Sequence, residues 1–281
     1  MNIAADQIAL LERLAAHHRL PRVRALHLPP ATGANGKNGE FCALELEDGA
    51  LGLSYVMLDD TLARLHREAA GARLAGADPL TLARRLATAP ESAGGTERSL
   101  GLAAINALTR HFFALAGFTP PPSRDSIGQM DPQPGERIGM VGHFRPLVKR
   151  IAEVGAELIV IELDPALAGQ HDGYRVSLDA AELRNCGKVL CTSSVLINGS
   201  VGRMLAAAAQ AQHFALIGPG AGCLPDPLFA NGVSLLGGSW ISDPQAFVDA
   251  LASGGAWGEH AFKFALARAD YPGFDALLAR C

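Results

Sequence analysis

The second half of the chain alternates between apolar runs of strand length and amphipathic stretches. The apolar runs lie at 137–141, 158–163, 188–192, 214–217 and 233–236, and helical periodicity lies at 146–154, 178–184, 199–209 and 244–253. Near-continuous apolar strands separated by helices are typical of a parallel sheet that is covered on both faces. We therefore predict an α/β, Rossmann-like parallel sheet for this half.

The first half shows a different pattern. It predicts a helix at 4–19, strands at 22–28, 41–47 and 51–58, and further helices at 59–75, 79–88 and 97–116. The second and third strands flank Asp48-Gly49, a strong hairpin signal, and a turn-rich loop spans Pro29–Gly39. This order predicts a smaller α+β domain with an antiparallel sheet.

A proline-rich segment separates the two patterns. Residues 118–135 carry five prolines and little apolar periodicity. Domain boundaries fall in such segments. We predict an N-terminal domain at 1–120, a linker at 121–135 and a Rossmann-like domain at 136–281.

The bulk composition narrows the function classes. A net charge of −4 and a pI of about 6.1 give no electrostatic footprint for nucleic acid. No apolar run approaches the roughly 20 residues that cross a bilayer, and the N-terminus shows no signal-peptide core. We expect a cytoplasmic protein with no nucleic-acid or membrane partner, and the many apolar positions would suit a homodimer.

Five cysteines are scattered along the chain. They are Cys42, Cys186, Cys191, Cys223 and Cys281, and none forms a Cys-x-x-Cys pair. The odd count and the spacing argue against a disulfide framework and against a structural zinc site.

Polar and glycine-rich loops follow the predicted strands of the second half. In an open parallel sheet, ligands bind at the carboxyl ends of the strands. The loops offer the candidate ligand-binding residues Gly142, His143, Phe144, Pro146, Glu162, Thr192, Asn198, Ser200, Gly218 and Pro219. We expect these loops to converge on one rim and to form a polar pocket.

The first strand–helix–strand unit raises the question of a nucleoside cofactor. Glu162 follows Gly142 by 20 residues, the interval at which an acidic side chain can meet a ribose hydroxyl. However, Gly139-Met-Val-Gly142 lacks the full G-x-G-x-x-G spacing, so a tight turn without a cofactor explains it equally well. Glu162 is also readable as a solvated strand end, His143 as an idle loop histidine, and Asn198 as a helix cap.

Neither a nucleophile nor a metal site is defined by spacing alone. No serine carries the G-x-S-x-G pattern of a nucleophile elbow. His143, Glu162, Asp164, His171 and Asp172 cluster around the first two strand ends, and the fold would have to gather them for a metal to bind. The catalytic and metal-ligating residues therefore stay unassigned.

Several motifs nevertheless resemble one family. They are Met140-Val-Gly-His-Phe-Arg-Pro-Leu-Val148, Val160-Ile-Glu-Leu-Asp-Pro165, Leu196-Ile-Asn-Gly-Ser200, Ile217-Gly-Pro219 and the glycines of 232–238. In this order they resemble the putative heavy-metal chelation family, a group of largely uncharacterised prokaryotic proteins. Leu100–Leu108 looks like the helix of that family's N-terminal companion domain.

The resemblance implies an enolase-N-terminal-like α+β domain packed on the Rossmann-like domain, with a pocket between them. Carried over by position, the pocket would draw on the strand-end residues named above and on Asn106 from the first domain. One departure is Gly220-Ala221-Gly222, where the family has Ser-Thr-Pro, so two hydroxyls are absent. Ser200 replaces a threonine and keeps the hydroxyl.

Three function hypotheses follow. The first is a protein that binds a small polar or anionic ligand, a heavy-metal ion or metal complex included, in an interdomain cleft. The second is an enzyme that uses a nucleoside cofactor such as S-adenosylmethionine or NAD. The third is a non-catalytic assembly or metal-insertion factor. The residues leave open which ligand, metal or cofactor binds, whether there is a reaction, and the oligomeric state.

Overall fold

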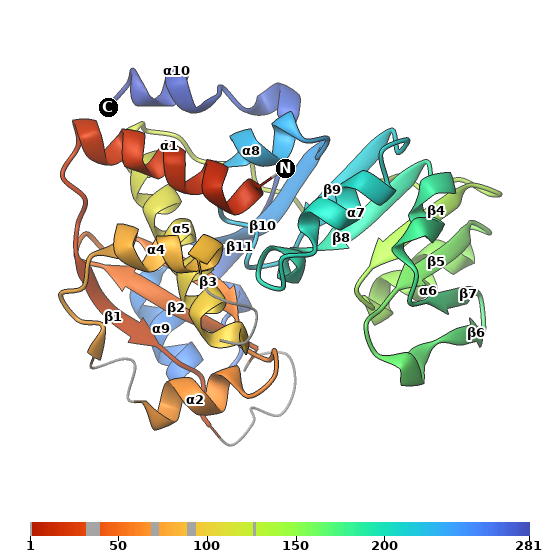
Figure 1. Ribbon diagram of the computed structural model, residues 1–281, viewed down its shortest axis with the longest axis horizontal. Coiled ribbons are helices and arrows are strands. Elements are labelled where there is room, and N and C mark those ends of the chain that lie inside the picture. Colours follow the sequence, from red (N-terminus) through yellow and green to blue (C-terminus); the bar gives the residue numbers. More distant parts are fainter. Residues whose placement is uncertain (1, 32–39, 69–72, 89–93, 126–127) are drawn as a thin grey trace.

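The computed structural model describes residues 2–31, 40–68, 73–88, 94–125 and 128–281 (Figure 1). Residues 32–39 of the predicted turn-rich loop lie outside this part, as do residues 126–127 of the predicted linker. Over the described residues, no helix combines the length and the apolar character that a membrane crossing requires.

A large sheet of eight strands organises the second half of the chain. The strands are β4 (Arg137–Val141), β5 (Glu157–Ile161), β6 (Gly169–His171), β7 (Tyr174–Ser177), β8 (Lys188–Thr192), β9 (His213–Ile217), β10 (Leu235–Ile241) and β11 (Ala261–Ala267). Their order is β11-β10-β9-β8-β4-β5-β7-β6. Every neighbouring pair is parallel except β6–β7 and β10–β11, which are antiparallel. The α/β prediction with a mostly parallel sheet is confirmed.

The chain reverses its direction of travel across this sheet at β4. From β4 it moves outward through β5 and β7, and then it returns to β8 on the other side of β4 and continues to β9 and β10. This is the doubly wound order of a Rossmann sheet, whose ligands bind beside the point of reversal. The fold therefore points to the crevice at the carboxyl ends of β4 and β8.

Both faces of the large sheet are buried, which explains why its strands are almost uniformly apolar. Ile138, Met140, Leu158 and Val160 share one core with the helix α6 (Arg145–Glu153). The intervening positions, such as Val141, Ile159 and Cys191, belong to the main core on the opposite face. That face carries the helix α7 (Val201–Ala207) and the 3-10 helix η4 (Ala180–Asn185).

A three-stranded antiparallel sheet lies in the first half. Its strands β1 (Val23–His27), β2 (Phe41–Leu46) and β3 (Leu51–Tyr55) pair in that order, and they form the small antiparallel sheet that was predicted. The accompanying helices are α1 (Ile3–His17), α2 (Thr61–Arg67), α4 (Pro79–Thr88) and α5 (Gly94–Leu115). Cys42, Leu44 and Leu46 face the core that contains α1, α4 and α5.

The other face of the small sheet is covered by a helix from the second half of the chain. Ala43, Leu51 and Leu53 pack against Ile241 and against Phe247 and Leu251 of α9 (Pro244–Ser253). Apolar residues on both faces of β2 and β3 are therefore satisfied by two different segments. The division of the chain at 121–135 stays a prediction, since the two lobes share these cores.

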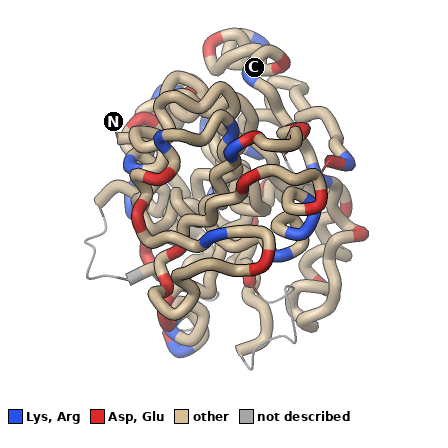
Figure 2. Tube along the Cα trace, turned by 90° about the vertical axis from the view of Figure 1, so that its right-hand side faces the viewer, with Lys and Arg blue, Asp and Glu red and all other residues tan. Residues whose placement is uncertain are grey.

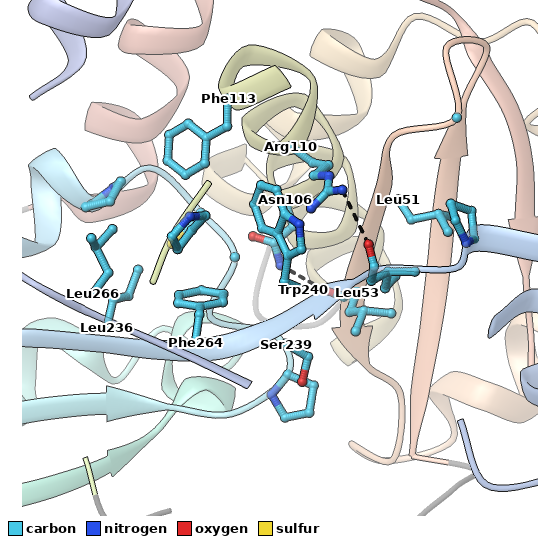
Figure 3. A pocket seen from close by; sticks show the side chains of 18 residues that line it. Leu51, Leu53, Asn106, Arg110, Phe113, Leu236, Ser239, Trp240, Phe264 and Leu266 are labelled. Atoms are coloured by element: carbon cyan, nitrogen blue, oxygen red, sulfur yellow. Dashed lines mark hydrogen bonds between the residues drawn. The ribbon is translucent and has the colours of Figure 1, made fainter. Parts of the chain in front are cut away.

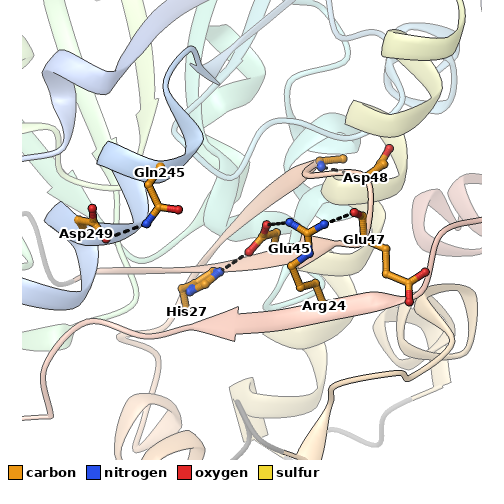
Figure 4. A network of polar contacts seen from close by, with 8 residues as sticks. Arg24, His27, Glu45, Glu47, Asp48, Gln245 and Asp249 are labelled. Atoms are coloured by element: carbon orange, nitrogen blue, oxygen red, sulfur yellow. Dashed lines mark hydrogen bonds and ion pairs between the residues drawn. The ribbon is translucent and has the colours of Figure 1, made fainter.

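A polar network reinforces the small sheet beside α9 (Figure 4). Glu45 of β2 accepts hydrogen bonds from Arg24 at 2.9 Å and lies 2.8 Å from the His27 ring, both on β1. Arg24 also donates to the backbone carbonyl of Glu47. The network joins β1 to β2 and leaves Glu45 paired on both oxygens.

Glutamine and asparagine side chains join the two lobes. Gln7 of α1 exchanges two hydrogen bonds with the backbone of Leu224, at 2.7 and 3.1 Å, just before α8 (Pro225–Ala230). The Gln7 amide donates to the Leu224 carbonyl and the Leu224 N–H donates to the Gln7 side-chain oxygen, so these buried polar groups all have hydrogen-bond partners. The N-terminal helix is thereby fixed to the large sheet's helical layer.

The sequence patterns missed several elements. The strands β6, β7 and β11 and the helices α8 and α10 (Phe274–Leu278) were not predicted, and the 178–184 segment forms the 3-10 helix η4. The strand β6 is exposed and polar, so it has no apolar signal. The helix α8 begins Pro225-Asp-Pro227, and prolines in a first helical turn look like loop residues in a sequence.

The chain between α5 and β4 closes one edge of the large sheet. Ser123 donates to the Lys263 carbonyl at 2.8 Å, and Ala265 donates to the Pro121 carbonyl at 3.2 Å. Pro122 and Phe264 form an antiparallel bridge. The start of the predicted linker therefore lies along β11 before the chain crosses to β4 in the middle of the sheet.

Charged residues are spread over the fold. Figure 2 shows Lys and Arg interspersed with Asp and Glu along the trace. Several of the salt bridges join two exposed side chains, for example Arg84 with Glu12 at 2.8 Å. Such exposed pairs contribute little to stability.

Candidate functional site

The strand register brings four of the predicted site positions into one row. Val141 lies opposite both Ile161 and Cys191, and Thr192 lies opposite Ile217. The next residues of these strands and loops, Gly142, Glu162, Thr192 and Gly218, therefore follow one another along the carboxyl rim. The expectation that the polar loops share one rim agrees with this register.

Gly142 directly follows β4, the strand at which the order of the sheet reverses. Its φ of +84° favours glycine, and its N–H donates to the Ile161 carbonyl at 3.0 Å. A Cβ here would lie 2.9 Å from the Thr192 methyl group. The loops after β4 and β8 therefore approach each other closely, and any larger residue would fill the space between them.

Glu162 is tied to the loop after β4. One carboxylate oxygen accepts the His143 N–H at 2.6 Å, and the other accepts the Leu163 N–H at 3.2 Å. Backbone N–H groups hold both oxygens, so the carboxylate orients the His143 loop. It retains lone pairs for a ligand, because a carboxylate accepts about four hydrogen bonds.

The His143 ring lies beside an aromatic pair from the hairpin β6–β7. Its ring lies 5.4 Å from the Tyr174 ring, which stacks on His171 at 4.8 Å. Burial lowers the pKa of His143, Arg145 and His171 lower it further, and Glu162 opposes them. The imidazole is therefore neutral at pH 7 and offers one donor and one acceptor.

We predict that His143 titrates below the ordinary histidine pKa of about 6.5. Glu162→Gln should lower the His143 pKa further, since it removes the negative charge that stabilises the imidazolium. Arg145→Met should raise it. The chemical shift of the His143 ring, followed by NMR against pH, gives all three values. Lys149→Met on the same helix is the matched control and should leave the pKa unchanged. A higher His143 pKa in Glu162→Gln, or a lower one in Arg145→Met, would contradict the charge interactions described here.

The loop after β8 carries a pair of hydroxyls. Thr192 Oγ1 lies 3.1 Å from Ser194 Oγ and accepts the Ser194 N–H at 3.4 Å. Only one of the two hydroxyl hydrogens can occupy the bond between them. The other is available to a ligand oxygen at the rim.

Asn198 and Ser200 serve the turn that leads into α7. Asn198 Oδ1 accepts both the Ser200 N–H at 3.0 Å and the Ser200 hydroxyl at 2.6 Å. This is a local turn before the helix and not a helix cap, because the N-cap of α7 is Ser200 and makes no side-chain capping bond. Arg98 of α5 donates to the Ile197 carbonyl of this loop.

Phe144 and Pro146 begin the helix α6. Phe144 is the residue before the helix and packs, half-buried, against the core on the α6 face, whereas Pro146 is exposed in the first turn. Proline suits a first helical turn, where its missing N–H is not needed. Both residues thus have a structural role in turning the chain after Gly142.

Asn106 joins the small sheet to the glycine-rich loop after β9. The side chain is 3% exposed, and its amide donates to the Leu53 carbonyl at 2.7 Å and to the Gly220 carbonyl at 2.9 Å. Gly218 lies against Ser193, where a Cβ would meet Ser193 Oγ at 2.5 Å. The loop is thus packed between β8 and α5.

A residue of the small sheet, Tyr55, interacts electrostatically with Glu162 at the strand reversal. Burial raises the pKa of Tyr55, at the end of β3, and the carboxylates of Glu40 and Glu162 raise it further. The Glu162 carboxylate and the Tyr55 hydroxyl are therefore within electrostatic range of each other.

A pocket lies where the two lobes meet farther along the rim (Figure 3). Asn106 and Arg110 of α5 line it together with Trp240 of β10 and Pro219 of the loop after β9. Arg110 and Trp240 were not singled out from the sequence. The available signal was that Arg110 is the one Asp, Glu, Lys or Arg residue between Ser99 and Ala116, on an otherwise apolar helix.

The donor groups of the described residues do not fit direct coordination of a heavy metal. No three His, Cys, Asp or Glu side chains in that part of the chain are placed around one ion. Asp164 caps a short helix at Ala166, and His171 bonds the Leu167 carbonyl. Burial raises the pKa of Cys42 and of Cys223 to about 12, so these thiols stay protonated at pH 7.

Comparisons with known proteins give a family match. Residues 125–269 match a family model described as "Putative heavy-metal chelation", and residues 39–109 match a second model with the same description. A comparison with curated proteins gave no significant match.

Two solved structures share the fold over nearly the whole chain. One is a protein of unknown function from Desulfitobacterium hafniense DCB-2, at 18% identity and a TM-score of 0.69, covering 95% of this chain and 98% of that chain. The other is a protein of unknown function from Pyrococcus horikoshii, at 18% identity and a TM-score of 0.62, with the same coverage. At this identity the likeness establishes the fold alone.

Proposed function

This chain belongs to the family described as "Putative heavy-metal chelation", and on that premise we propose that it binds a small polar or anionic ligand. The proposed place is the cleft between the rim of the large sheet and the N-terminal lobe. We propose that a heavy metal binds to the protein only when it is already chelated by that ligand. The carrying observation is the reversal of strand order at β4, which sets Gly142, Glu162 and Thr192 side by side.

The groups at the reversal point suit a ligand with several oxygen atoms. The free hydroxyl hydrogen of the Thr192–Ser194 pair can donate to it, and the neutral His143 ring can donate or accept. The absent side chain at Gly142 lets the loops after β4 and β8 pack against each other, which places Thr192 beside the end of β4. Glu162 would accept from a ligand hydroxyl while it holds the His143 loop.

A metal complex fits these residues better than a bare ion. Oxygen-rich chelators present carboxylate and hydroxyl oxygens on their outer surface, which hydrogen-bond donors recognise. Direct coordination would need at least three protein donors, and the described residues do not gather them. The protein's own contribution would be to bind and orient the chelator and to exclude water around it.

We expect the Ni²⁺–citrate complex to stabilise the protein in a thermal-unfolding assay. At a ligand concentration one hundredfold above the dissociation constant, stabilisation should reach about 2.7 kcal/mol. For a chain of this size, that corresponds to a rise in Tm of roughly 5–10 °C. Ni²⁺ chloride alone should give a much smaller rise. An equal shift with the free ion would instead indicate direct coordination and contradict the proposal.

Thr192→Val tests the location of this site. It removes one hydroxyl but keeps the shape of the side chain, so we expect binding of the Ni²⁺–citrate complex to weaken roughly tenfold. Thr88→Val, at the end of α4, is the matched control because its hydroxyl bonds only the Arg84 carbonyl. If both variants bind the Ni²⁺–citrate complex with equal affinity, the complex does not bind at the strand reversal beside Thr192.

A nucleoside-dependent enzyme is the second candidate. The doubly wound strand order and the acidic residue after β5 favour it. Against it, Gly139-Met-Val-Gly142 lacks the full G-x-G-x-x-G spacing of a dinucleotide-binding turn. Stabilisation by S-adenosylmethionine, NAD or adenosine in the same thermal assay, without any effect of Ni²⁺–citrate, would select this candidate.

A further inference from the structure

Arg110 is a cation held inside the pocket between the lobes. It lies on α5, and its guanidinium carbon stacks 3.3 Å from the centre of the Trp240 ring. Its Nη2 donates to the Ile241 carbonyl at 3.3 Å, which is a long hydrogen bond. Its Nη1 is buried and finds no hydrogen-bond partner among the described residues.

No carboxylate balances this charge within the part of the chain that the structure describes, where every recorded salt bridge uses other residues. Burial lowers the pKa of Arg110 to about 10, so the side chain remains charged at pH 7. A partly buried guanidinium without an anion is unfavourable for folding, and stacking on the Trp240 ring offsets part of this cost. Such a group is typical of a binding site that an anion completes.

A second orphan group faces the same pocket. Asn106 lies one helical turn before Arg110, and residues four apart share a helix face. Its amide nitrogen is fully used by the Leu53 and Gly220 carbonyls, which fixes the side chain's orientation. Its Oδ1 is buried and accepts no hydrogen bond from any described residue. This oxygen requires a donor, whereas Arg110 requires an acceptor.

The remaining walls are apolar. The cavity volume is about 40 Å³, above the roughly 10–15 Å³ that one water needs. Around the two polar groups the walls are formed mainly by Leu51, Leu53, Phe113, Leu236, Phe264 and Leu266. At about 40 Å³ the enclosed space accepts a compact polar head, and an aliphatic body would lie against the apolar side chains toward the open side of the pocket (Figure 3).

We propose that this pocket binds a small hydroxycarboxylate with an apolar body. The carboxylate pairs with Arg110, the hydroxyl donates to Asn106 Oδ1, and the aliphatic part packs among the leucines and phenylalanines. A hydroxyl fits better than an ammonium, because a second cation beside Arg110 would leave the pocket's positive charge uncompensated. The site is separate from the one proposed at the strand reversal, and it rests on Arg110 and Asn106 alone.

Four related compounds test the two polar contacts separately. They are 2-hydroxy-4-methylpentanoate, 4-methylpentanoate without the hydroxyl, leucine with an ammonium in its place, and leucinol without the carboxylate. Isothermal titration calorimetry on the full chain should give the tightest binding for the hydroxy acid. Loss of the hydroxyl should weaken it roughly tenfold, since Asn106 Oδ1 is left unpaired. Leucine should bind more weakly than the hydroxy acid, and leucinol should not bind measurably.

Arg110→Met separates a binding role from a structural one. Methionine keeps the length and packing but removes the charge, so binding of 2-hydroxy-4-methylpentanoate should be lost. The Tm should stay within roughly 3 °C of the wild type or rise, because an uncompensated buried charge disappears. Arg110→Lys should bind more weakly than the wild type, since an ammonium lacks the two-pronged geometry for a carboxylate.

Arg85→Met is the matched control. Arg85 is a half-buried arginine of the same lobe that already pairs with Glu97 at 2.8 Å, so its loss should leave the affinity for the hydroxy acid unchanged. The proposal is overturned if millimolar 2-hydroxy-4-methylpentanoate fails to bind the wild type. It is also overturned if Arg110→Met binds the compound as the wild type does.

Discussion

Replacing Gly52 with alanine should destabilise the protein by about 3 kcal/mol, one of the two largest effects expected here. Gly52 lies on β3 directly against the backbone of α5. A Cβ at this position would fall 2.8 Å from the Ala107 Cα and closer still to the Ala103 carbonyl oxygen. These are backbone atoms of a long helix and cannot rotate away, so the helix itself must shift. Thermal or urea unfolding should show a Tm lowered by roughly 6–12 °C.

Gly187→Ala provides the control for this change. A Cβ at Gly187 meets no atom within 4 Å, and its φ lies outside the range that favours glycine. Its Tm should remain near that of the wild type. If Gly52→Ala unfolds at the same temperature as Gly187→Ala, then β3 and α5 are not packed as closely as described. Because α5 carries Asn106 and Arg110, the Gly52 variant should also lose ligand binding.

Asn106→Ala should lower the free energy of unfolding by about 2–5 kcal/mol. The change leaves the Leu53 and Gly220 carbonyls without the amide that serves them in a buried place. Each such orphan costs about 1–3 kcal/mol. Urea unfolding monitored by circular dichroism gives the difference directly.

Asn231→Ala is the matched control for Asn106. The Asn231 amide makes one local bond, to the Pro227 carbonyl at 2.7 Å in the last turn of α8. Its removal should cost about 1 kcal/mol. Equal losses in the two variants would mean that the Asn106 bonds do not join the lobes.

Much of the large sheet could be predicted from the sequence because its strands are buried on both faces. Apolar runs of strand length that lie between predicted helices, such as Leu158–Ile161 and Val189–Cys191, indicate parallel strands that are buried on both faces. The glycine and acidic residues at the strand ends then fall on one rim, because parallel strands end on the same side. Gly142, Glu162 and Thr192 were placed correctly as neighbours by this logic alone.

Relations between distant segments could not be predicted in the same way. The pattern of α9 shows one buried face, but nothing in it indicates that the partner is the small sheet formed some 200 residues earlier. The strands of the hairpin β6–β7 are short and mostly polar, so the sequence shows no alternation of apolar and polar residues long enough to predict them. Asn198 looked like a ligand-binding amide, whereas in the structure its oxygen is occupied by its own turn.

Arg110 illustrates a further limit. A charged residue within an apolar helix is visible in the sequence, but an ion pair, a solvated edge and a binding site would all produce it. Only the three-dimensional surroundings show which groups lack partners. Conversely, the cluster of His143, Glu162, Asp164, His171 and Asp172 suggested coordination, and the described residues do not gather it around an ion.

The pairing of residues 121–123 with β11 has a consequence for biosynthesis. A strand that ends a sheet exposes unpaired N–H and C=O groups, which recruit other chains into aggregates. Here the segment that shields it leaves the ribosome some 140 residues before β11 itself. Until β11 has been synthesised, the outer side of β10 has unpaired N–H and C=O groups, the kind of edge at which a partly synthesised chain aggregates.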